Sequence, residues 1–268
     1  MDVGNAFESP EYLAEWATKE AKKFTSVRKE FFSDPNVCAR VVEFDPEIGE
    51  NVIKMRLFKI LPVELRGLAS NAIKNFRDAL DQTTFAATFL IRDKGSNRAH
   101  FPFGENPDDL ENSLSRRKSV PCKGLAEELF PVLRECEPYP TGDGYTGGND
   151  VLRALARVSG DNKHAVTLTV SAAVDQTTIN PGVVQVGPGG ATLYVPPEWD
   201  AVKNEIKLWS FPPGSYVNVD MSVALAIGFG PGPLERYAVE FFLDELARDV
   251  PVIINRIKQA TAKIIVDR

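Results

Sequence analysis

The chain has 268 residues, of which 43% are hydrophobic and 25% charged, a mixture typical of a globular protein rather than a disordered or fibrous one. Its net charge of −6 argues against a general binder of nucleic acid, because an acidic protein repels phosphate at long range. The three cysteines form no C-x-x-C pair, which argues against a disulfide framework or a cysteine zinc site.

The first predicted element is a helix that begins at Ser9-Pro10-Glu11, where a capping residue precedes proline and an acid. It should end at Ser33-Asp34-Pro35, because the residue before a proline disfavours the helical conformation. Two β-rich runs follow at 38–44 and 52–60, and the residues between them, 45–49, have turn chemistry. Together they predict a β-hairpin.

The strongest signal in the chain is a helix from residue 62 to about 91. Its apolar stripe comprises Leu65, Leu68, Ala69, Ala72, Ile73, Phe76, Ala79, Leu80, Thr83, Ala87 and Leu90. Phe85 and Phe89 lie on the face opposite this stripe, so we expect the C-terminal half of the helix to be covered on two sides. The cover can come from the chain itself or from a second subunit, and a homodimer is one alternative.

Three shorter helices are predicted next, at 108–114, 123–130 and 151–158, with Pro131 limiting the second of them. From residue 165 the period changes to that of strands. The expected strands are 166–174, 182–186, 191–195, 204–209 and 216–229, and a last helix, 234–266, should be kinked or broken at Pro251.

Closely spaced strands without intervening helices favour an antiparallel sheet, so the predicted fold class is α+β. We see no linker-like stretch between the helix-rich half, about 1–164, and the β-rich half, about 165–268. The sequence therefore predicts one domain, 1–268, built in two layers.

The usual catalytic motifs are missing from the sequence: no phosphate-binding P-loop, no G-x-S-x-G, no H-E-x-x-H and no G-x-G-x-x-G. Only His100 and His164 are present, so a site with several histidine ligands for a metal is impossible. We expect neither a metal nor a cofactor. The N-terminus has no basic run before an apolar stretch, and no apolar run approaches the ~20 residues of a membrane helix. These features favour a cytoplasmic protein of bacterial type.

One polar constellation lies on the long helix. At 100° per residue, Arg77 and Asp81 share one edge of the apolar stripe, and Asn75 and Gln82 share the other. Side chains at such an edge are half-buried, where an Arg–Asp pair can be held rigidly. An ordinary i,i+4 ion pair, worth a few tenths of a kcal/mol, is the simplest interpretation.

A second candidate is the segment 160–164, between a helix and the first strand of the β-rich half. Its Lys163 disfavours the protonated form of the neighbouring His164, which suits a neutral base. A turn whose polar side chains satisfy nearby backbone groups is an equally good interpretation.

Both signals belong to an ordered set of motifs that resembles a family of bacterial proteins with no established activity. Members of that family have G-D-x-L-H-N-L-R-S-A-L-D-H-L in a long helix after a β-hairpin, then F-P-[IF], L-x-P-Y and N-x-D-K-H. Here the matching segments are 70–82, Phe101-Pro102-Phe103, Glu137-Pro138-Tyr139 and Asn162-Lys163-His164. The ordered set spans roughly the first 165 residues.

The R-x-x-x-x-H step of that family is similar to the R-x(4–6)-H signature of HEPN ribonucleases. The resemblance implies metal-independent cleavage of RNA, with an arginine and a histidine acting at the phosphodiester bond. This chain departs from the pattern, because Lys74, Gln82 and Asn162 replace the two helix histidines and the aspartate. Gln82 cannot transfer a proton near neutral pH.

Three hypotheses follow from these residues. The first is a binding or interaction protein, whose ligand contacts would come from Asn75, Arg77, Asp81, Lys163 and His164. The second is a HEPN-like ribonuclease or its degenerate relative, with Arg77 holding phosphate, His164 acting as the base and Asp81 beside them. In the third, these side chains only tie the long helix to the loop before the β-rich half.

Overall fold

The computed structural model describes residues 3–96, 98–115, 122, 124–161, 170–194, 199–200, 202–229, 234 and 237–268. They form an α+β fold with an N-terminal helix, a β-hairpin and a long helix before the antiparallel strands and the C-terminal helix, as predicted. Two compact units are present. The first comprises Met1–Lys23, Gly67–Thr167 and Phe241–Arg268, and the second comprises Phe24–Arg66 and Leu168–Glu240. Each unit contains residues from both the helix-rich half and the β-rich half of the sequence. The single domain, 1–268, therefore stays a prediction.

The described helices are α1 (Val3–Ser33), α2 (Val63–Arg92), α3 (Pro107–Ser115), η1 (Glu127–Leu129), α4 (Phe130–Arg134), α5 (Asp150–Asp161) and α6 (Val239–Val266). The strands are β1 (Cys38–Asp45), β2 (Glu50–Leu57), β3 (Val170–Gln185), β4 (Thr192–Leu193), β5 (Trp199–Asp200), β6 (Glu205–Phe211) and β7 (Tyr216–Phe229). None of the helices in the described part of the chain is long and apolar enough to cross a membrane.

Helix α1 begins at Val3, so the predicted start at Ser9 is wrong, and Pro10 lies inside the helix. A proline in the second turn removes only one backbone hydrogen bond. Burial of Phe7 and Pro10 offsets that loss. The hydroxyl of Ser9 therefore does not cap α1 but donates to Gln82 of α2, at 2.6 Å. The helix ends at Ser33, as predicted.

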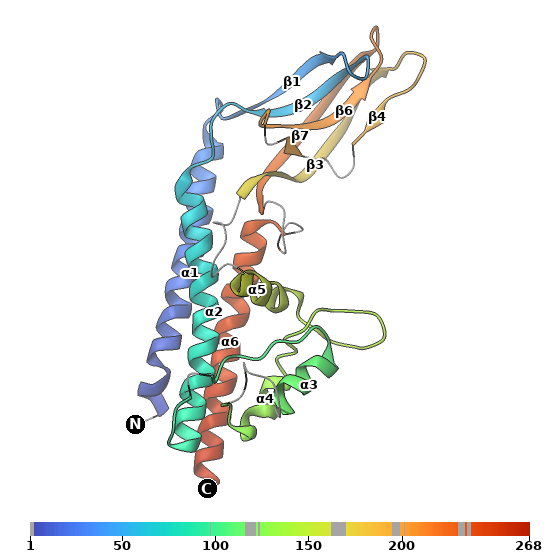
Figure 1. Ribbon diagram of the computed structural model, residues 1–268. Coiled ribbons are helices and arrows are strands. Elements are labelled where there is room, and N and C mark those ends of the chain that lie inside the picture. The colour runs from blue at the N-terminus through green and yellow to red at the C-terminus, as the bar shows by residue number, and fades with distance from the viewer. Residues whose placement is uncertain are drawn as a thin grey trace. The chain divides into compact units, whose positions relative to one another are not determined.

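In the first unit, α2 lies against parts of α1 and α6, and α3, α4 and α5 are packed beside them (Figure 1). The predicted apolar stripe of α2 is buried throughout, except that Leu90 is half-buried. An ion pair from Lys258 to Glu11 (2.6 Å) and a hydrogen bond from Asn149 to Asp249 (3.1 Å) fasten α6 to α1 and to the start of α5. The largest fully buried side chains of this unit are Phe7, Phe76, Phe101, Phe242, Leu80, Leu114, Leu129, Leu133 and Leu152.

Two prolines are tolerated where the sequence predicted a break. Pro131 lies in the first turn of α4, where its missing N–H has no partner to lose, so the helix continues to Arg134. Pro251 lies inside α6, which runs unbroken from Val239 to Val266. In that helix, buried apolar side chains before and after the proline hold both parts in place.

The face of α2 opposite its apolar stripe is covered in part. The Thr84 hydroxyl donates to the Ala99 carbonyl (2.8 Å), and the Thr88 hydroxyl accepts the Ala126 N–H (3.3 Å). Both contacts lie within this chain, so no second subunit is needed to cover these positions. The prediction was wrong for Phe85, whose ring remains 42% exposed, while Phe89 is half-buried.

The second unit contains the predicted hairpin, and all its described strand pairs are antiparallel. A five-stranded sheet has the order β1-β2-β6-β4, with β5 also paired to β6, and β3 and β7 form a separate two-stranded sheet. The apolar core of the larger sheet comprises Ile53, Ile206, Leu208 and Phe211, against which Val217 of β7 packs. In the β1–β2 turn, the Asp45 carboxylate accepts the Glu47 N–H, and Gly49 has φ of +70°.

Strand β3 is longer than predicted, because it joins two runs that the sequence separated at Asn180-Pro181. Its pairing with β7 shifts register between Asn180 and Val183. A bulge at this point accommodates the missing N–H of proline without ending the strand. Residues 166–169, where the first of these runs was expected to begin, lie outside the described residues.

Candidate functional site

The two polar edges of α2, which the helical spacing predicted, face two different neighbours. On one edge, Asn75 donates to Glu20 of α1 at 3.0 Å, and Gln82 accepts from Ser9 of the same helix. This edge therefore fastens α2 to α1. The other edge, with Arg77 and Asp81, faces the loop that follows α2.

Arg77 and Asp81 form a two-point ion pair. The Nε of Arg77 lies 3.1 Å from Oδ2 of Asp81, and its Nη2 lies 3.1 Å from Oδ1. The two side chains are only 16% and 22% exposed. The guanidinium carbon also lies 4.3 Å from the centre of the Phe103 ring, a cation–π contact. Paired at its edge and stacked on its face, the guanidinium has a fixed orientation.

The segment Ala99–Phe103 is bound to this edge through its backbone. The Phe101 N–H donates to Oδ1 of Asp81 (2.9 Å), and the carbonyl of Ala99 accepts from Thr84 (2.8 Å). The Phe101 side chain is 1% exposed, and its ring makes an edge contact with that of Phe103. The short Phe-Pro-Phe segment is thus the part of the chain that the Arg77–Asp81 pair recognises.

His100 lies between Ala99 and Phe101, whose backbones are hydrogen-bonded to α2. It was not among the site residues predicted from sequence. Its Nδ1 lies 3.5 Å from Oδ2 of Asp81, and its side chain is 45% exposed. A carboxylate facing one ring nitrogen of a histidine orients the ring. We call Arg77, Asp81, His100 and Phe103 the helix cluster. The available signal was the position of His100 directly before Phe101-Pro102-Phe103.

Cys122 is the thiol on which the charges of Arg77 and Asp81 both act. Burial raises its pKa to about 11, and the effects of Arg77 and Asp81 oppose each other. Burial likewise raises the pKa of Cys136, to about 12. Thiols with raised pKa values are poor nucleophiles, so neither cysteine is a candidate for covalent catalysis.

The other half of the predicted site lies outside the described residues. These are Asn162, Lys163 and His164, directly after the end of α5 at Asp161. The approach of His164 to Arg77 that the sequence suggested therefore stays a prediction. Among the described residues, no group of three or more His, Cys, Asp or Glu side chains could hold a metal ion.

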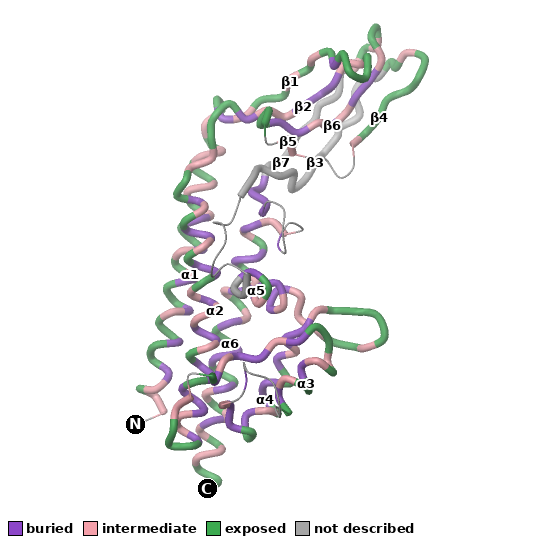
Figure 2. The backbone as a smooth tube through the Cα atoms, in the orientation of Figure 1, coloured by how far each residue is buried: buried purple, intermediate pink, exposed green. Residues whose placement is uncertain are grey.

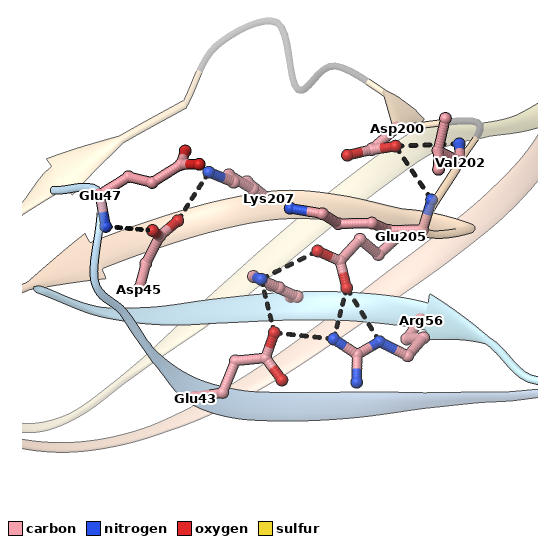
Figure 3. Close-up of polar contacts among 10 residues, drawn as sticks. Glu43, Asp45, Glu47, Arg56, Asp200, Val202, Glu205 and Lys207 are labelled. Carbon is pink, nitrogen blue, oxygen red and sulfur yellow. Dashed lines mark hydrogen bonds and ion pairs between the residues drawn. The ribbon is translucent and has the colours of Figure 1, made fainter.

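A second polar cluster lies on the five-stranded sheet and comprises Glu43, Lys54, Arg56 and Glu205, which we call the sheet network. Figure 3 shows Glu43, Arg56 and Glu205 converging from β1, β2 and β6. Lys54 lies 2.6 Å from Glu43 and 2.8 Å from Glu205. Arg56 lies 2.7 Å from Glu43 and reaches Glu205 through Nε (2.8 Å) and Nη2. Each carboxylate thus meets both cations.

The sheet network is buried at its centre, since the side chains of Glu205 and Lys54 are 1% and 5% exposed. Burial alone raises the pKa of Glu205, but hydrogen bonds from Lys54 and Arg56 outweigh it and hold the pKa below its usual range. Burial likewise lowers the pKa of Lys54, and the two glutamates more than reverse this. With two acids and two bases bonded to one another, the sheet network has no charge left over for a ligand.

An open pocket of about 920 Å³ lies where α2 ends, lined in part by Arg92, Lys94, Glu127, Glu128 and Arg268. Arg268 is paired with Glu128 and also donates to the Ile91 carbonyl. Three basic and two acidic side chains line this pocket, so most of its charge is compensated, and it shares no residue with the helix cluster. We therefore regard the helix cluster as the candidate site.

Comparison of the chain with protein-family models, with curated proteins and with solved structures gives no match. The functional argument therefore depends on the helix cluster itself.

Proposed function

We propose that the chain is a binding protein that holds a small anionic group, a phosphate or a carboxylate, at the helix cluster. The observation that carries this proposal is the contact of His100 with Asp81, at 3.5 Å, beside the Arg77–Asp81 pair. Asp81 engages only part of the guanidinium of Arg77, and the half-exposed imidazole of His100 adds a second polar group beside it.

The arrangement favours a compact ligand over a long polyanion. A guanidinium has five N–H donors, and Asp81 engages it at only two of its nitrogens. The imidazole of His100 can add a charge-assisted hydrogen bond from Nε2. The chain as a whole carries a charge of −6, which opposes the approach of an extended nucleic acid more than that of a single phosphate.

We also place the chain in the bacterial cytoplasm. Its three cysteines, Cys38, Cys122 and Cys136, are all free thiols. Free thiols persist where glutathione and thioredoxin keep cysteines reduced. This supports the cytoplasmic assignment.

Nuclear magnetic resonance of the imidazole groups tests anion binding directly, because the chain contains only two histidines. Inorganic phosphate titrated into the protein should shift the His100 signals saturably, and His100→Gln identifies them. Arg77→Gln should weaken binding at least about tenfold, since Asp81 is then left uncompensated beside the anion. Arg134→Gln is the matched control, because Arg134 also pairs with an acid, Glu111, in the same unit.

Saturable shifts in the parent and in Arg134→Gln, but not in Arg77→Gln, would support the proposal. Phosphate that leaves the His100 signals unchanged, or that binds Arg77→Gln as tightly as the parent, would contradict it. Circular dichroism and urea unfolding of each variant separate lost binding from lost structure. A parent that binds nothing, with variants that are only less stable, would leave the helix cluster as a fastening between α2 and residues 99–103.

A second candidate is a metal-independent ribonuclease similar to HEPN enzymes, and one observation favours it. His100 brings a proton-transferring group to Arg77, which Gln82 cannot provide. In such a reaction His100 would take the proton of a ribose 2′-hydroxyl while Arg77 neutralises a phosphate oxygen. The attack would form a 2′,3′-cyclic phosphate and release the 5′-oxygen, which takes a proton from solvent.

Incubation of the protein with labelled RNA in the presence of EDTA tests this second candidate. Cleavage by the parent that His100→Gln abolishes, with 2′,3′-cyclic phosphate ends, would establish it. The His164→Gln variant belongs in the same experiment, because His164 is the base that the sequence suggested. Intact RNA with the parent, at protein concentrations that bind phosphate, would leave anion binding without turnover.

A further inference from the structure

The two edges of the five-stranded sheet are built differently. One edge ends in β4, which has only two residues. The other edge is β1, which has eight residues and pairs with β2 over its whole length without a register shift. A long, regular edge strand presents a row of backbone N–H and C=O groups that can pair with another strand.

Strand β1 exposes two large apolar side chains next to Arg40. Val42 and Phe44, on one face, are 51% and 55% exposed, and Ile48 in the following turn is 46% exposed. Val42 pairs with Ile53 of β2, which is fully buried in the apolar core of the sheet. The apolar face of the sheet therefore continues onto β1, where it is exposed to solvent (Figure 2).

Edge strands of monomeric proteins are commonly protected by a proline, a bulge or outward charged side chains, especially lysine. Strand β1, whose sequence is CARVVEFD, has no proline, no lysine and no bulge in its pairing with β2, and Arg40 is its exposed charged residue. Strand β2, which is central, has the register shift instead, between Ile53 and Lys54 in its pairing with β6. The regular edge and the exposed apolar side chains thus occur on the same strand.

We propose that β1 pairs antiparallel with β1 of a second copy of this chain, about a two-fold axis at Val42. A two-fold axis perpendicular to the sheet keeps each face on its own side, so the axis must pass beside a residue rather than between two. With the axis at Val42, this residue faces itself, and Arg40 faces Phe44 of the second copy. The latter pair occurs twice and allows a cation–π contact each time.

The neighbouring axis positions are less favourable. An axis at Glu43 places two glutamates directly opposite each other, which is destabilising. An axis at Val41 places Phe44 opposite the half-buried Cys38, which offers it no charge and little apolar surface. The register at Val42 covers Val42 and Phe44 of both copies with apolar or cationic partners and, unlike the register at Glu43, places no like charges opposite each other.

The pairing would join two sheets into one that is continuous across the dimer. A single strand pair with two exposed apolar residues from each copy makes a small interface, so we expect a dissociation constant in the micromolar range. The proposal does not depend on anion binding, because β1 belongs to the second unit and the helix cluster to the first.

Sedimentation equilibrium of the full chain, from about 1 to 200 μM, should show reversible doubling of the 29.5 kDa mass. Val42→Lys should weaken this dimer at least about tenfold, since it places two like charges opposite each other and removes the central apolar contact. Val42→Glu should do the same. Val202→Lys is the matched control, because Val202 is 92% exposed in the same unit and should leave the dimer unchanged.

Mixing the Val42→Lys and Val42→Glu variants is the sharpest test of the register. The mixture places opposite charges together only if residue 42 of one copy faces residue 42 of the other. The mixed dimer should therefore form, while each variant alone stays monomeric. In a Cys38→Ser background, Val42→Cys should also form a disulfide-linked dimer on mild oxidation. Circular dichroism confirms that each variant is folded.

A chain that stays monomeric at 200 μM, a dimer that Val42→Lys does not weaken, or mixed variants that fail to pair would each overturn the proposal. In the first case, the edge would be left for a strand of another protein or for none. In the second case, the dimer would use another surface. In the third case, β1 would pair in another register.

Discussion

The sheet network and the helix cluster show two ways in which a protein can bury charge. In the sheet network, each of two carboxylates contacts both of two cations, and Glu205 is 1% exposed. In the helix cluster, one carboxylate serves Arg77, the Phe101 N–H and His100, and the histidine is 45% exposed. The first arrangement is complete without a ligand, whereas the second leaves the imidazole of His100 half-exposed beside the guanidinium. Burial of charge therefore does not by itself identify a functional site.

The largest effect that separates the two clusters should come from Glu205→Ala. Removing this carboxylate leaves the buried Lys54 with only Glu43 as an acidic partner in the sheet network. Breaking a buried ion pair by removing one partner costs about 3–5 kcal/mol of the free energy of unfolding. Urea unfolding, followed by circular dichroism, measures the loss. The matched control is the double variant Lys54→Met/Glu205→Met, which retains the Arg56–Glu43 pair.

The double variant should unfold at a urea concentration similar to, or higher than, that of the parent. Apolar residues of similar volume often replace a buried ion pair at no cost, since the desolvation of both charges disappears. If the double variant were as unstable as Glu205→Ala, the charges themselves and not their mutual compensation would be stabilising the sheet.

Acid should weaken the sheet network by a smaller amount, because a protonated carboxyl group can still take part in a hydrogen bond. Hydrogen bonds from Lys54 and Arg56 lower the pKa of Glu43, and those same donors hold the pKa of Glu205 low against the effect of burial. The stability that these two groups supply is therefore present above about pH 4.3, the usual glutamate pKa, and is lost as the pH falls through their lower folded values.

Urea midpoints measured between pH 7 and pH 3 give this dependence. In the Lys54→Met/Glu205→Met variant the fall in stability towards pH 3 should be shallower than in the parent. Equal slopes in the two proteins would show that other carboxylates, such as Asp45 and Glu111, account for the acid sensitivity.

The smallest effect should come from His100→Gln, which we expect to change the free energy of unfolding by less than about 0.5 kcal/mol. The imidazole is half-exposed, and the loop keeps its anchors through Phe101 and Ala99. Thermal unfolding measures this difference. A loss of several kcal/mol would make His100 a structural residue and would weaken the argument for a ligand at the helix cluster.

Much of the fold was predictable because local patterns and tertiary packing agree. The stripe of α2, the hairpin and its turn at Asp45–Gly49, and the antiparallel strands all follow from periodicity and turn chemistry. The start of α1 was not predictable in this way, since burial of Phe7 and Pro10 outweighs the helix-start signal at Ser9. The division into two units could not be predicted from local sequence patterns either, because it depends on which distant segments pack together.

Half of the candidate site was visible in the sequence and half was not. Arg77 and Asp81 are four residues apart on one helix, so their pairing follows from helical geometry alone. His100 reaches Asp81 from a loop, and its position depends on the contacts of Phe101 and Thr84. No periodicity relates residues 81 and 100, and only the three-dimensional fold brings them together.

The order of segments along the chain has a consequence during synthesis on the ribosome. The apolar stripe of α2 is complete at residue 92, but Phe241–Arg268, which belong to the same unit, are made only after Leu168–Glu240. At typical elongation rates of about 5–20 residues per second, roughly 10–35 s pass between the synthesis of Arg92 and that of Arg268. During that interval the stripe lacks part of its native cover, so the growing chain exposes apolar surface that the folded unit buries.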